Sequence, residues 1–178
     1  MKKLIIAIAT IASAVVANAA ACSWSTTGTI YKPTDSTTAV AGFTAYLFDT
    51  TTVTQSALVE AIRGGASITD YTAMSTYTTG SAAKVSSTSF EHAEGSITAF
   101  FAIVQDDYVY ISNEKTATAA SVGSATFSFA SQSASSAKVF DSTTAYSSAG
   151  WYQSVPEPTS GLLMLLGMAG LALRRRRA

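Results

Sequence analysis

Two apolar segments without charge, one near each end of the chain, most strongly limit what its 178 residues can fold into. Residues 4–16 follow Met1-Lys2-Lys3, and residues 161–173 are followed by four arginines. Neither segment has the polar face that a helix on a globular domain needs. Residues 22–154 are therefore expected to form the folded part, and they suffice for one domain with a core of its own.

The N-terminal segment has the pattern of a secretory signal peptide. Such signals combine a basic start, an apolar run of 7–15 residues and an A-x-A cleavage site, whereas a transmembrane helix needs about 20 apolar residues. Ala17-Asn18-Ala19 and Ala19-Ala20-Ala21 both provide the A-x-A pattern. We therefore predict a signal helix within residues 1–21, removed by cleavage after Ala19 or after Ala21.

Either cleavage leaves Cys22, the single cysteine of the chain, close to the mature N-terminus. One cysteine excludes an internal disulfide framework and a Cys-rich zinc site. We expect an exposed or lightly packed thiol. A lipidated cysteine is the alternative, although Ala19 stands where a lipobox usually has a larger aliphatic residue.

The C-terminal segment combines a proline motif, an apolar stretch and a basic end. The motif is Val155-Pro156-Glu157-Pro158, whose prolines disfavour a helix before them. Residues 161–173 would span about 20 Å as a helix, against about 30 Å of bilayer hydrocarbon, so the predicted hydrophobic helix is short for a permanent span. The positive-inside rule keeps the basic end in the cytoplasm, where it acts as a stop-transfer cluster. That cluster is Arg174, Arg175, Arg176 and Arg177.

Residues 155–178 resemble a PEP-CTERM sorting signal in this motif, in the apolar stretch and in the arginine cluster. The resemblance implies export by the secretion machinery, transient residence in the inner membrane, recognition by an exosortase and cleavage near the motif. It further implies delivery to the cell surface or to an exopolysaccharide matrix. A plain C-terminal membrane anchor is the alternative. Because unrelated domains carry such tails, the resemblance says nothing about residues 22–154.

Residues 22–154 contain five basic and ten acidic residues, and this formal net charge of −5 excludes a basic face for nucleic acid. Ser, Thr and Ala make up about half of them, a composition that often indicates disorder. The aromatic residues nevertheless fall in short clusters, and Thr, Tyr, Phe and Val suit strands. We predict a mainly β fold, a single small β-sandwich-like domain with one short helix.

Four segments are predicted as strands or hairpins: residues 28–32, 40–49, 96–111 and 122–131. The strongest is 96–111, where Gln105-Asp106-Asp107 separates two apolar runs and predicts a hairpin with a central strand buried on both faces. In 40–49 and 122–131 apolar residues alternate, as in half-buried strands. The alternating residues are Phe43, Ala45 and Leu47 on one face and Tyr46 and Phe48 on the other, then Phe127 and Phe129.

One segment has helical rather than alternating spacing. Residues 54–63 begin with a hydroxyl suited to an N-cap and end before Gly64-Gly65, which predicts a short helix against the sheet. The apolar positions of this helix are Ala57, Leu58, Ala61 and Ile62.

Asp35, Asp49 and Asp141 each begin a motif of the form Asp-[Ser/Thr]-Thr-Thr-[Ala/Val]. Asp side chains bond to backbone amides two residues on, so we predict turns at strand ends. A calcium site, the alternative, would need more carboxylates at fixed offsets. We predict no metal and no cofactor.

Catalytic residues are scarce, because His92 is the only histidine. It lies in Glu91-His92-Ala93-Glu94, where strand alternation would put Glu91 and Ala93 on one face and His92 and Glu94 on the other. We expect an exposed polar strand end or loop and no enzyme, and interpret Asp106-Asp107 as a turn rather than a carboxylate pair.

Three classes of function remain for residues 22–154. The first is a non-enzymatic exported surface or extracellular-matrix protein of a bacterium. The second is a carbohydrate-binding module that stacks exposed aromatic rings on sugars. The third and most remote is an extracellular hydrolase using His92. The aromatic candidates for sugar stacking are Trp24, Tyr46, Tyr71, Tyr77 and Trp151.

Overall fold

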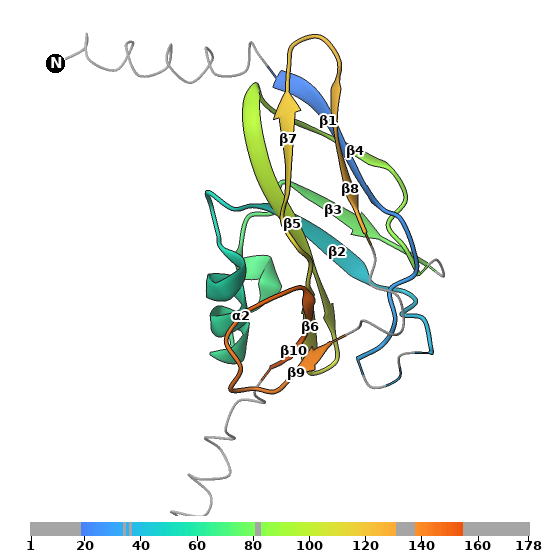
Figure 1. Ribbon diagram of the computed structural model, residues 1–178, viewed down its shortest axis with the longest axis vertical. Coiled ribbons are helices and arrows are strands. Elements are labelled where there is room, and N and C mark those ends of the chain that lie inside the picture. The colour runs from blue at the N-terminus through green and yellow to red at the C-terminus, as the bar shows by residue number, and fades with distance from the viewer. Residues whose placement is uncertain (1–18, 34, 36, 81–82, 131–137, 155–178) are drawn as a thin grey trace, which may run out of the picture.

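The computed structural model describes residues 19–33, 35, 37–80, 83–130 and 138–154, which form two β-sheets and one α-helix (Figure 1). The small sheet has the strand order β4-β1-β8, and the large sheet has the order β3-β2-β5-β6-β10-β9, with β7 also paired to β5. The strands are β1 (Ala19–Thr26), β2 (Thr44–Asp49), β3 (Ser75–Thr78), β4 (Thr88–Ala93), β5 (Gly95–Gln105), β6 (Tyr108–Ile111), β7 (Lys115–Ala119), β8 (Ser124–Phe129), β9 (Val139–Phe140) and β10 (Gly150–Gln153). These elements confirm the expected mainly β domain with one helix.

The two predicted flanking helices fall mainly on residues 1–18 and 155–178, outside the described residues, whereas residues 19–21 of the predicted signal segment belong to β1. Within the described ranges no helix is long and apolar enough to cross a membrane.

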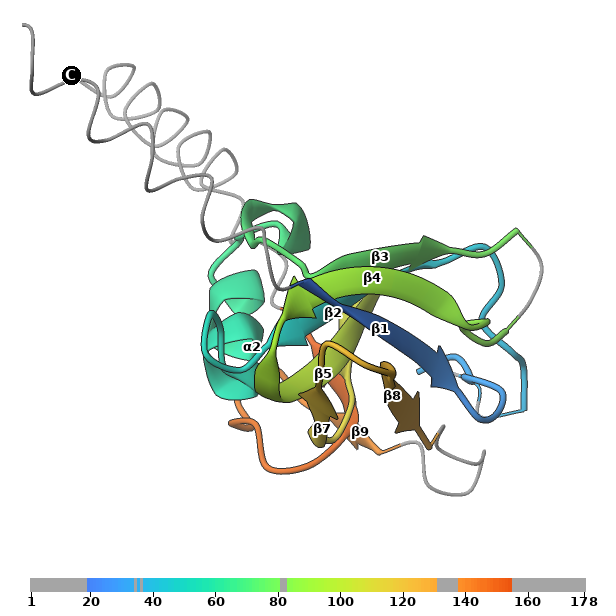
Figure 2. The same cartoon turned by 90° about the horizontal axis from the view of Figure 1, so that it is seen from above.

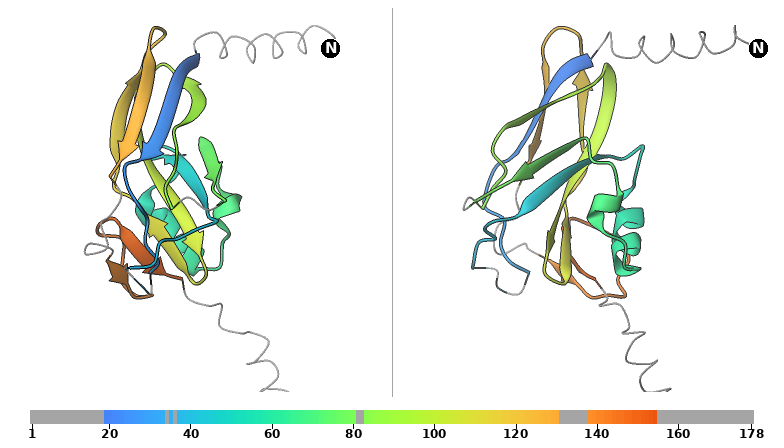
Figure 3. Two further views of the ribbon diagram at one scale, coloured as in Figure 1. Left: turned by 90° about the vertical axis from the view of Figure 1, so that its right-hand side faces the viewer. Right: turned by 180° about the vertical axis from the view of Figure 1, so that it is seen from behind.

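The domain has three layers, because the large sheet is buried on both faces (Figures 2 and 3). One core fills the space between the two sheets and contains Trp24, Leu47, Phe101, Phe127 and Trp151. The second core lies between the large sheet and the helix α2 (Gln55–Arg63) and contains Phe48, Leu58, Ile62, Phe100 and Tyr152.

Strand β5 belongs to both cores. Phe101 and Ile103 face the small sheet, while Phe100 and Ala102 face α2. β5 continues through the two-residue turn Asp106-Asp107 into β6, and it pairs with β2 along its other edge. The predicted hairpin and its strand buried on both faces are therefore confirmed.

Helix α2 confirms the predicted helix, but its apolar face is rotated. Thr54 caps it by accepting a hydrogen bond from the Ala57 amide at 3.3 Å. The helix ends before Gly64 and Gly65, and the φ of +91° at Gly65 favours glycine. The residues buried against the sheet are Gln55, Leu58, Val59 and Ile62. Ala57, expected on this face, is exposed, because Val59 takes the position beside Leu58.

The predictions for the other strands had mixed outcomes. Residues 40–49 contain β2, with the two faces as expected, and 122–131 contain β8, where Phe127 and Phe129 are buried. Residues 28–32 are not a strand, so that prediction is wrong. Ile30 is buried there, but its amide bonds to Ala83 and only Tyr31 forms an isolated bridge.

The first strand, β1, was not predicted. It runs antiparallel to β4 and parallel to β8, in the middle of the small sheet. Cys22 lies on its inward face with 1% of its surface exposed, so the expected exposed or lightly packed thiol is wrong. Burial also raises the pKa of this thiol.

Candidate functional site

The described domain is held in place up to Ser154, its last residue. In β10, Gln153 lies opposite Tyr108 of β6. The amide and the hydroxyl of Ser154 both donate to the Asp107 carbonyl, each at 2.7 Å. The predicted sorting motif, residues 155–158, and the stop-transfer cluster, residues 174–177, lie outside the described residues. Ser154, the last described residue, therefore directly precedes the first residue of that motif in the sequence.

Arg63, the last residue of α2, binds the segment that leads to this end. Its Nε donates to the Gln153 carbonyl at 3.2 Å, its Nη1 to the Thr144 carbonyl at 2.6 Å and its Nη2 to the Asp141 carbonyl at 2.5 Å. The guanidinium carbon also lies 5.7 Å from the centre of the Tyr152 ring. Because a guanidinium presents its donors in one rigid plane, a single side chain joins three points of the C-terminal segment to the helix.

No role for Arg63 follows from the sequence. The signal available was an isolated arginine in the last turn of a predicted helix, a place where a cation is favourable for the helix itself. That signal does not reveal carbonyl partners some 80 residues further along the chain.

The motifs at Asp35 and Asp141 form the predicted turns. The Asp35 carboxylate accepts from the Thr37 amide at 2.9 Å and from the hydroxyls of Thr37 and Thr38. The Asp141 carboxylate accepts from the amides and hydroxyls of Thr143 and Thr144, at 2.7–3.0 Å. The turn prediction is therefore confirmed at both positions.

These hydrogen bonds stabilise the charged form of both carboxylates. The hydroxyls of Thr37 and then Thr38 contribute most to lowering the pKa of Asp35, to about 2. The hydroxyls of Thr144 and then Thr143 lower the pKa of Asp141, also to about 2.

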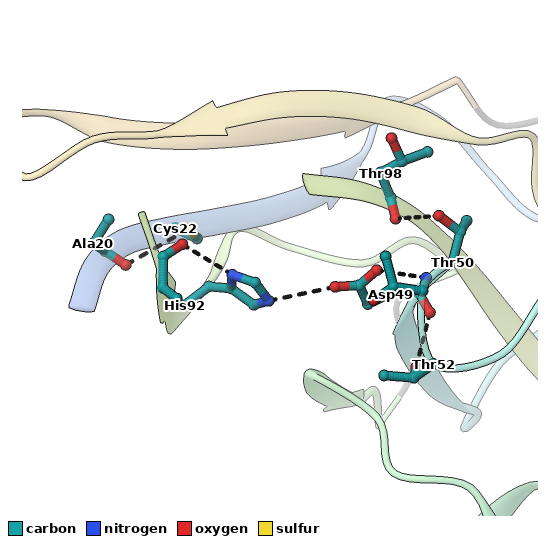
Figure 4. A network of polar contacts seen from close by, with 9 residues as sticks. Ala20, Cys22, Asp49, Thr50, Thr52, His92 and Thr98 are labelled. Carbon is teal, nitrogen blue, oxygen red and sulfur yellow. Dashed lines mark hydrogen bonds and ion pairs between the residues drawn. The ribbon is translucent and has the colours of Figure 1, made fainter. Parts of the chain in front are cut away.

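Asp49 forms the same type of turn but leaves one carboxylate oxygen for another partner. Its Oδ1 accepts from the Thr51 amide at 2.8 Å, while the Thr52 hydroxyl bonds to the main-chain carbonyl of Asp49. Its Oδ2 lies 3.5 Å from Nε2 of His92 (Figure 4). The contact joins the end of β2 in the large sheet to the end of β4 in the small sheet.

His92 is therefore half-buried rather than exposed, with 28% of its side-chain surface accessible. The expected alternation is present, because Glu91 and Ala93 are exposed on the outer face of β4 while His92 points inward. Glu94 lies beyond the end of the strand and is exposed. The expectation of an exposed polar strand end or loop is confirmed for Glu91 and Glu94 and wrong for His92, because β2 ends beside β4 and brings in Asp49.

The two ring nitrogens of His92 both face hydrogen-bond acceptors. Nδ1 lies 3.1 Å from the Ala93 carbonyl, which can only accept, so a hydrogen bond there requires a proton on Nδ1, and Nε2 faces the Asp49 carboxylate. A general base needs a lone pair directed at the proton it removes. A general-base role for His92 would need one of these two contacts to be replaced by a contact with the group that loses the proton.

The aromatic residues proposed for sugar stacking belong to the cores or to their margins. Trp24 and Trp151 have no exposed surface. Their indole N–H groups donate inside the domain at 3.0 Å, to the Ser75 hydroxyl and the Tyr31 carbonyl. Two of the five candidates for sugar stacking, Trp24 and Trp151, are therefore core residues. Tyr46, Tyr71 and Tyr77 are half-buried and pack against the cores.

Metal-binding groups do not gather in residues 19–33, 35, 37–80, 83–130 and 138–154, where no three His, Cys, Asp or Glu side chains lie close enough to hold an ion.

Comparison with known proteins places one family on the chain. No curated protein and no solved structure matches it. The family described as the PEP-CTERM protein-sorting motif matches residues 154–177. The match begins at Ser154, the last described residue, whose hydroxyl donates to the Asp107 carbonyl. The chain thus carries a PEP-CTERM sorting motif, which marks it as an exosortase-targeted protein exported to the cell surface or the extracellular space.

Proposed function

We propose that residues 22–154 are a non-enzymatic surface or matrix domain that the sorting tail delivers. The observation that carries this proposal is the PEP-CTERM match at residues 154–177 directly after a folded domain whose last residue is hydrogen-bonded. An exosortase is the processing partner. The inner membrane holds the chain transiently, and an exopolysaccharide matrix is the proposed destination.

The construction of the domain supports a passive role outside the cell. Four strands of the large sheet, β2, β5, β6 and β10, contribute to both cores, and cross-strand hydroxyl pairs on exposed faces join neighbouring strands without requiring charge. Examples are Ser23 with Thr126 at 3.2 Å and Thr98 with Thr116 at 2.9 Å. Such pairs contribute modestly to sheet stability. They are neutral, so their contribution does not depend on pH or salt.

The geometry around His92 supports a structural role for this residue in place of the hydrolase alternative. An imidazolium would donate to the Ala93 carbonyl and the Asp49 carboxylate at once, thereby joining the two sheets. A catalytic role would require one of these contacts to break.

Two of the five aromatic candidates for the carbohydrate-binding alternative, Trp24 and Trp151, are buried in the core. Sugar stacking would have to use half-buried tyrosines such as Tyr46, whose ring packs at 6.4 Å from that of Phe48. We therefore favour the surface or matrix role.

The proposal is tested in the native cells, with and without the exosortase. The full-length chain is followed by intact-mass analysis of membrane, surface and medium fractions. We expect a surface species lacking residues beyond the Pro-Glu-Pro motif in the wild type, and a membrane-bound species ending at Ala178 without the exosortase. A surface form that still ends at Ala178 would instead indicate a permanent anchor.

Two variants complete this test. Changing all four arginines, 174–177, to serine removes the stop-transfer signal, so we expect unprocessed protein in the medium. His92→Ala should leave a glycan-hydrolysis screen of the purified protein unchanged from wild type. Hydrolysis by the wild type that disappears in His92→Ala would replace the passive role with an enzymatic one.

A further inference from the structure

The sequence fits signal cleavage after Ala19 or after Ala21, and the structure distinguishes these two positions. Residues Ala19–Thr26 form β1, the middle strand of the small sheet (Figure 1). The two candidate bonds therefore lie inside a strand of the folded domain. Each cut leaves a different part of that strand in the mature protein.

Cleavage after Ala21 would remove a paired and partly buried portion of β1. Ala19, Ala20 and Ala21 lie opposite residues 93, 92 and 91 of β4, and Ala21 also pairs with Ser124 of β8. Ala20 has 1% of its surface exposed and belongs to the core between the sheets.

The same cut would also place a new charged amino group at a buried position. Cys22 would become the first residue, with 1% of its surface exposed and with Phe90 and Ala125 as its neighbours on the two adjacent strands. Removing an ammonium group from water without a charged partner is strongly unfavourable. The Cys22 sulfur also points into the core, where a lipid could not be attached to it without opening the sheet.

Cleavage after Ala19 retains the buried part of the strand. Only the exposed Ala19 and its pairing with Ala93 are lost, while Ala20 and its pairing with His92 remain. β8 pairs with β1 from Ala21 onward, so the strand edge beside Ala20 is open on that side. A terminal ammonium group on Ala20 would therefore have a paired strand on one side only, whereas one on Cys22 would lie between two paired strands.

We propose that the Ala19–Ala20 peptide bond is the signal cleavage site, and that the mature protein begins with Ala20 and carries no lipid on Cys22. Water adds across the bond, leaving a carboxylate on Ala19 and an ammonium group on Ala20. Ala17 and Ala19 are the small residues that the peptidase reads. The assignment rests on the proposed export, because only an exported chain meets the peptidase.

The test uses the full-length chain in the native cells, followed by N-terminal sequencing and intact-mass analysis of the exported protein. We expect a single N-terminus at Ala20 without a lipid mass. A start at Cys22, with or without a lipid, would overturn the site but leave export intact. A chain that keeps its first residues and stays in the cytoplasm would overturn both.

Two single substitutions form a matched pair in this test. Ala21→Thr removes the small residue required for the later cut, at an exposed strand position that suits threonine. We expect processing at Ala20 as in the wild type. Ala17→Phe removes the small residue required for the proposed cut, and we expect at least a tenfold loss of the form starting at Ala20. The reverse pattern, loss of processing in Ala21→Thr and none in Ala17→Phe, would refute the assignment.

Discussion

Arg63→Ala should destabilise the domain more than any other exposed or half-exposed charge deletion, because three carbonyls of the C-terminal segment depend on one guanidinium. A hydrogen bond to a charged group contributes about 1.5–3 kcal/mol when shielded from water and less when exposed. Two of the three bonds are partly buried and the third is exposed.

Counting about 1 kcal/mol for each partly buried bond, little for the exposed one and about 0.5–1 kcal/mol for the contact with the Tyr152 ring gives a loss of about 2.5–3 kcal/mol. The carbonyls can bind water in the variant, which keeps the loss at this level. Arg63→Lys keeps the charge but not the planar fork, so we expect it to recover less than half of the loss.

The measurement is urea unfolding of the exported protein, followed by the fluorescence of the two buried tryptophans, Trp24 and Trp151. Lys115→Ala is the control, since Lys115 is an exposed cation on β7, and its effect should stay within about 0.5 kcal/mol. If Arg63→Ala and Lys115→Ala had equal effects, the three carbonyl contacts would not hold the C-terminal segment.

Three further predictions concern turns and close packing. Because the pKa values of Asp35 and Asp141 are about 2 when folded and near 3.8 when unfolded, their contribution to stability is complete above about pH 4 and is lost as the pH falls toward 2. The melting temperature of the double Asn variant should therefore fall less steeply across that range than that of the wild type, and an identical slope would contradict the turn geometry. Gly150→Ala should lower the free energy of unfolding by about 1–3 kcal/mol in urea, because its Cβ would lie 2.7 Å from the Lys138 carbonyl oxygen and from a ring carbon of Phe140. A loss below about 0.5 kcal/mol would show that β9 can move aside. Asp106, with φ of +51°, is in the left-handed region. Asp106→Val should therefore lower the free energy of unfolding by about 1–2 kcal/mol in the same assay, and Asp106→Gly should change it little. Equal effects of the two variants would contradict that conformation.

The elements predicted from the sequence are those with large apolar side chains in a clear period. β5 and β6 form the longest apolar run, and α2 has both a capping hydroxyl and a glycine stop. In these segments burial and local propensity favour the same structure, so the sequence alone was sufficient.

Among the strands that were missed, β7 and β1 illustrate two different reasons. β7 has the sequence Lys-Thr-Ala-Thr-Ala, and Ala119 is its one buried residue. β1 does alternate, with Ala20, Cys22, Trp24 and Thr26 buried. Its first three alanines also fit a signal cleavage site, so these residues were assigned to the signal peptide and the strand was not predicted.

The contacts of the candidate site could not be predicted from sequence patterns. The motif at Asp49 predicts its own turn, since that depends only on neighbouring residues. Its contact with His92 depends on how two different sheets end beside one another. The same holds for Arg63, whose acceptors are backbone carbonyls that any residue would provide.

The position of β1 in the small sheet has a consequence for the order in which the chain can fold. Ser23 and Thr126 are bonded across β1 and β8, although 103 residues separate them, and β4 on the other side begins only at Thr88. A domain dominated by such distant pairings has a high contact order and folds slowly. When the chain passes through a membrane channel from its N-terminus, β1 emerges long before either neighbour and cannot pair with β4 or β8 until they follow. The last strand, β10, emerges just before the sorting motif. Translocation is therefore nearly finished by the time all strands of both sheets are available to pair.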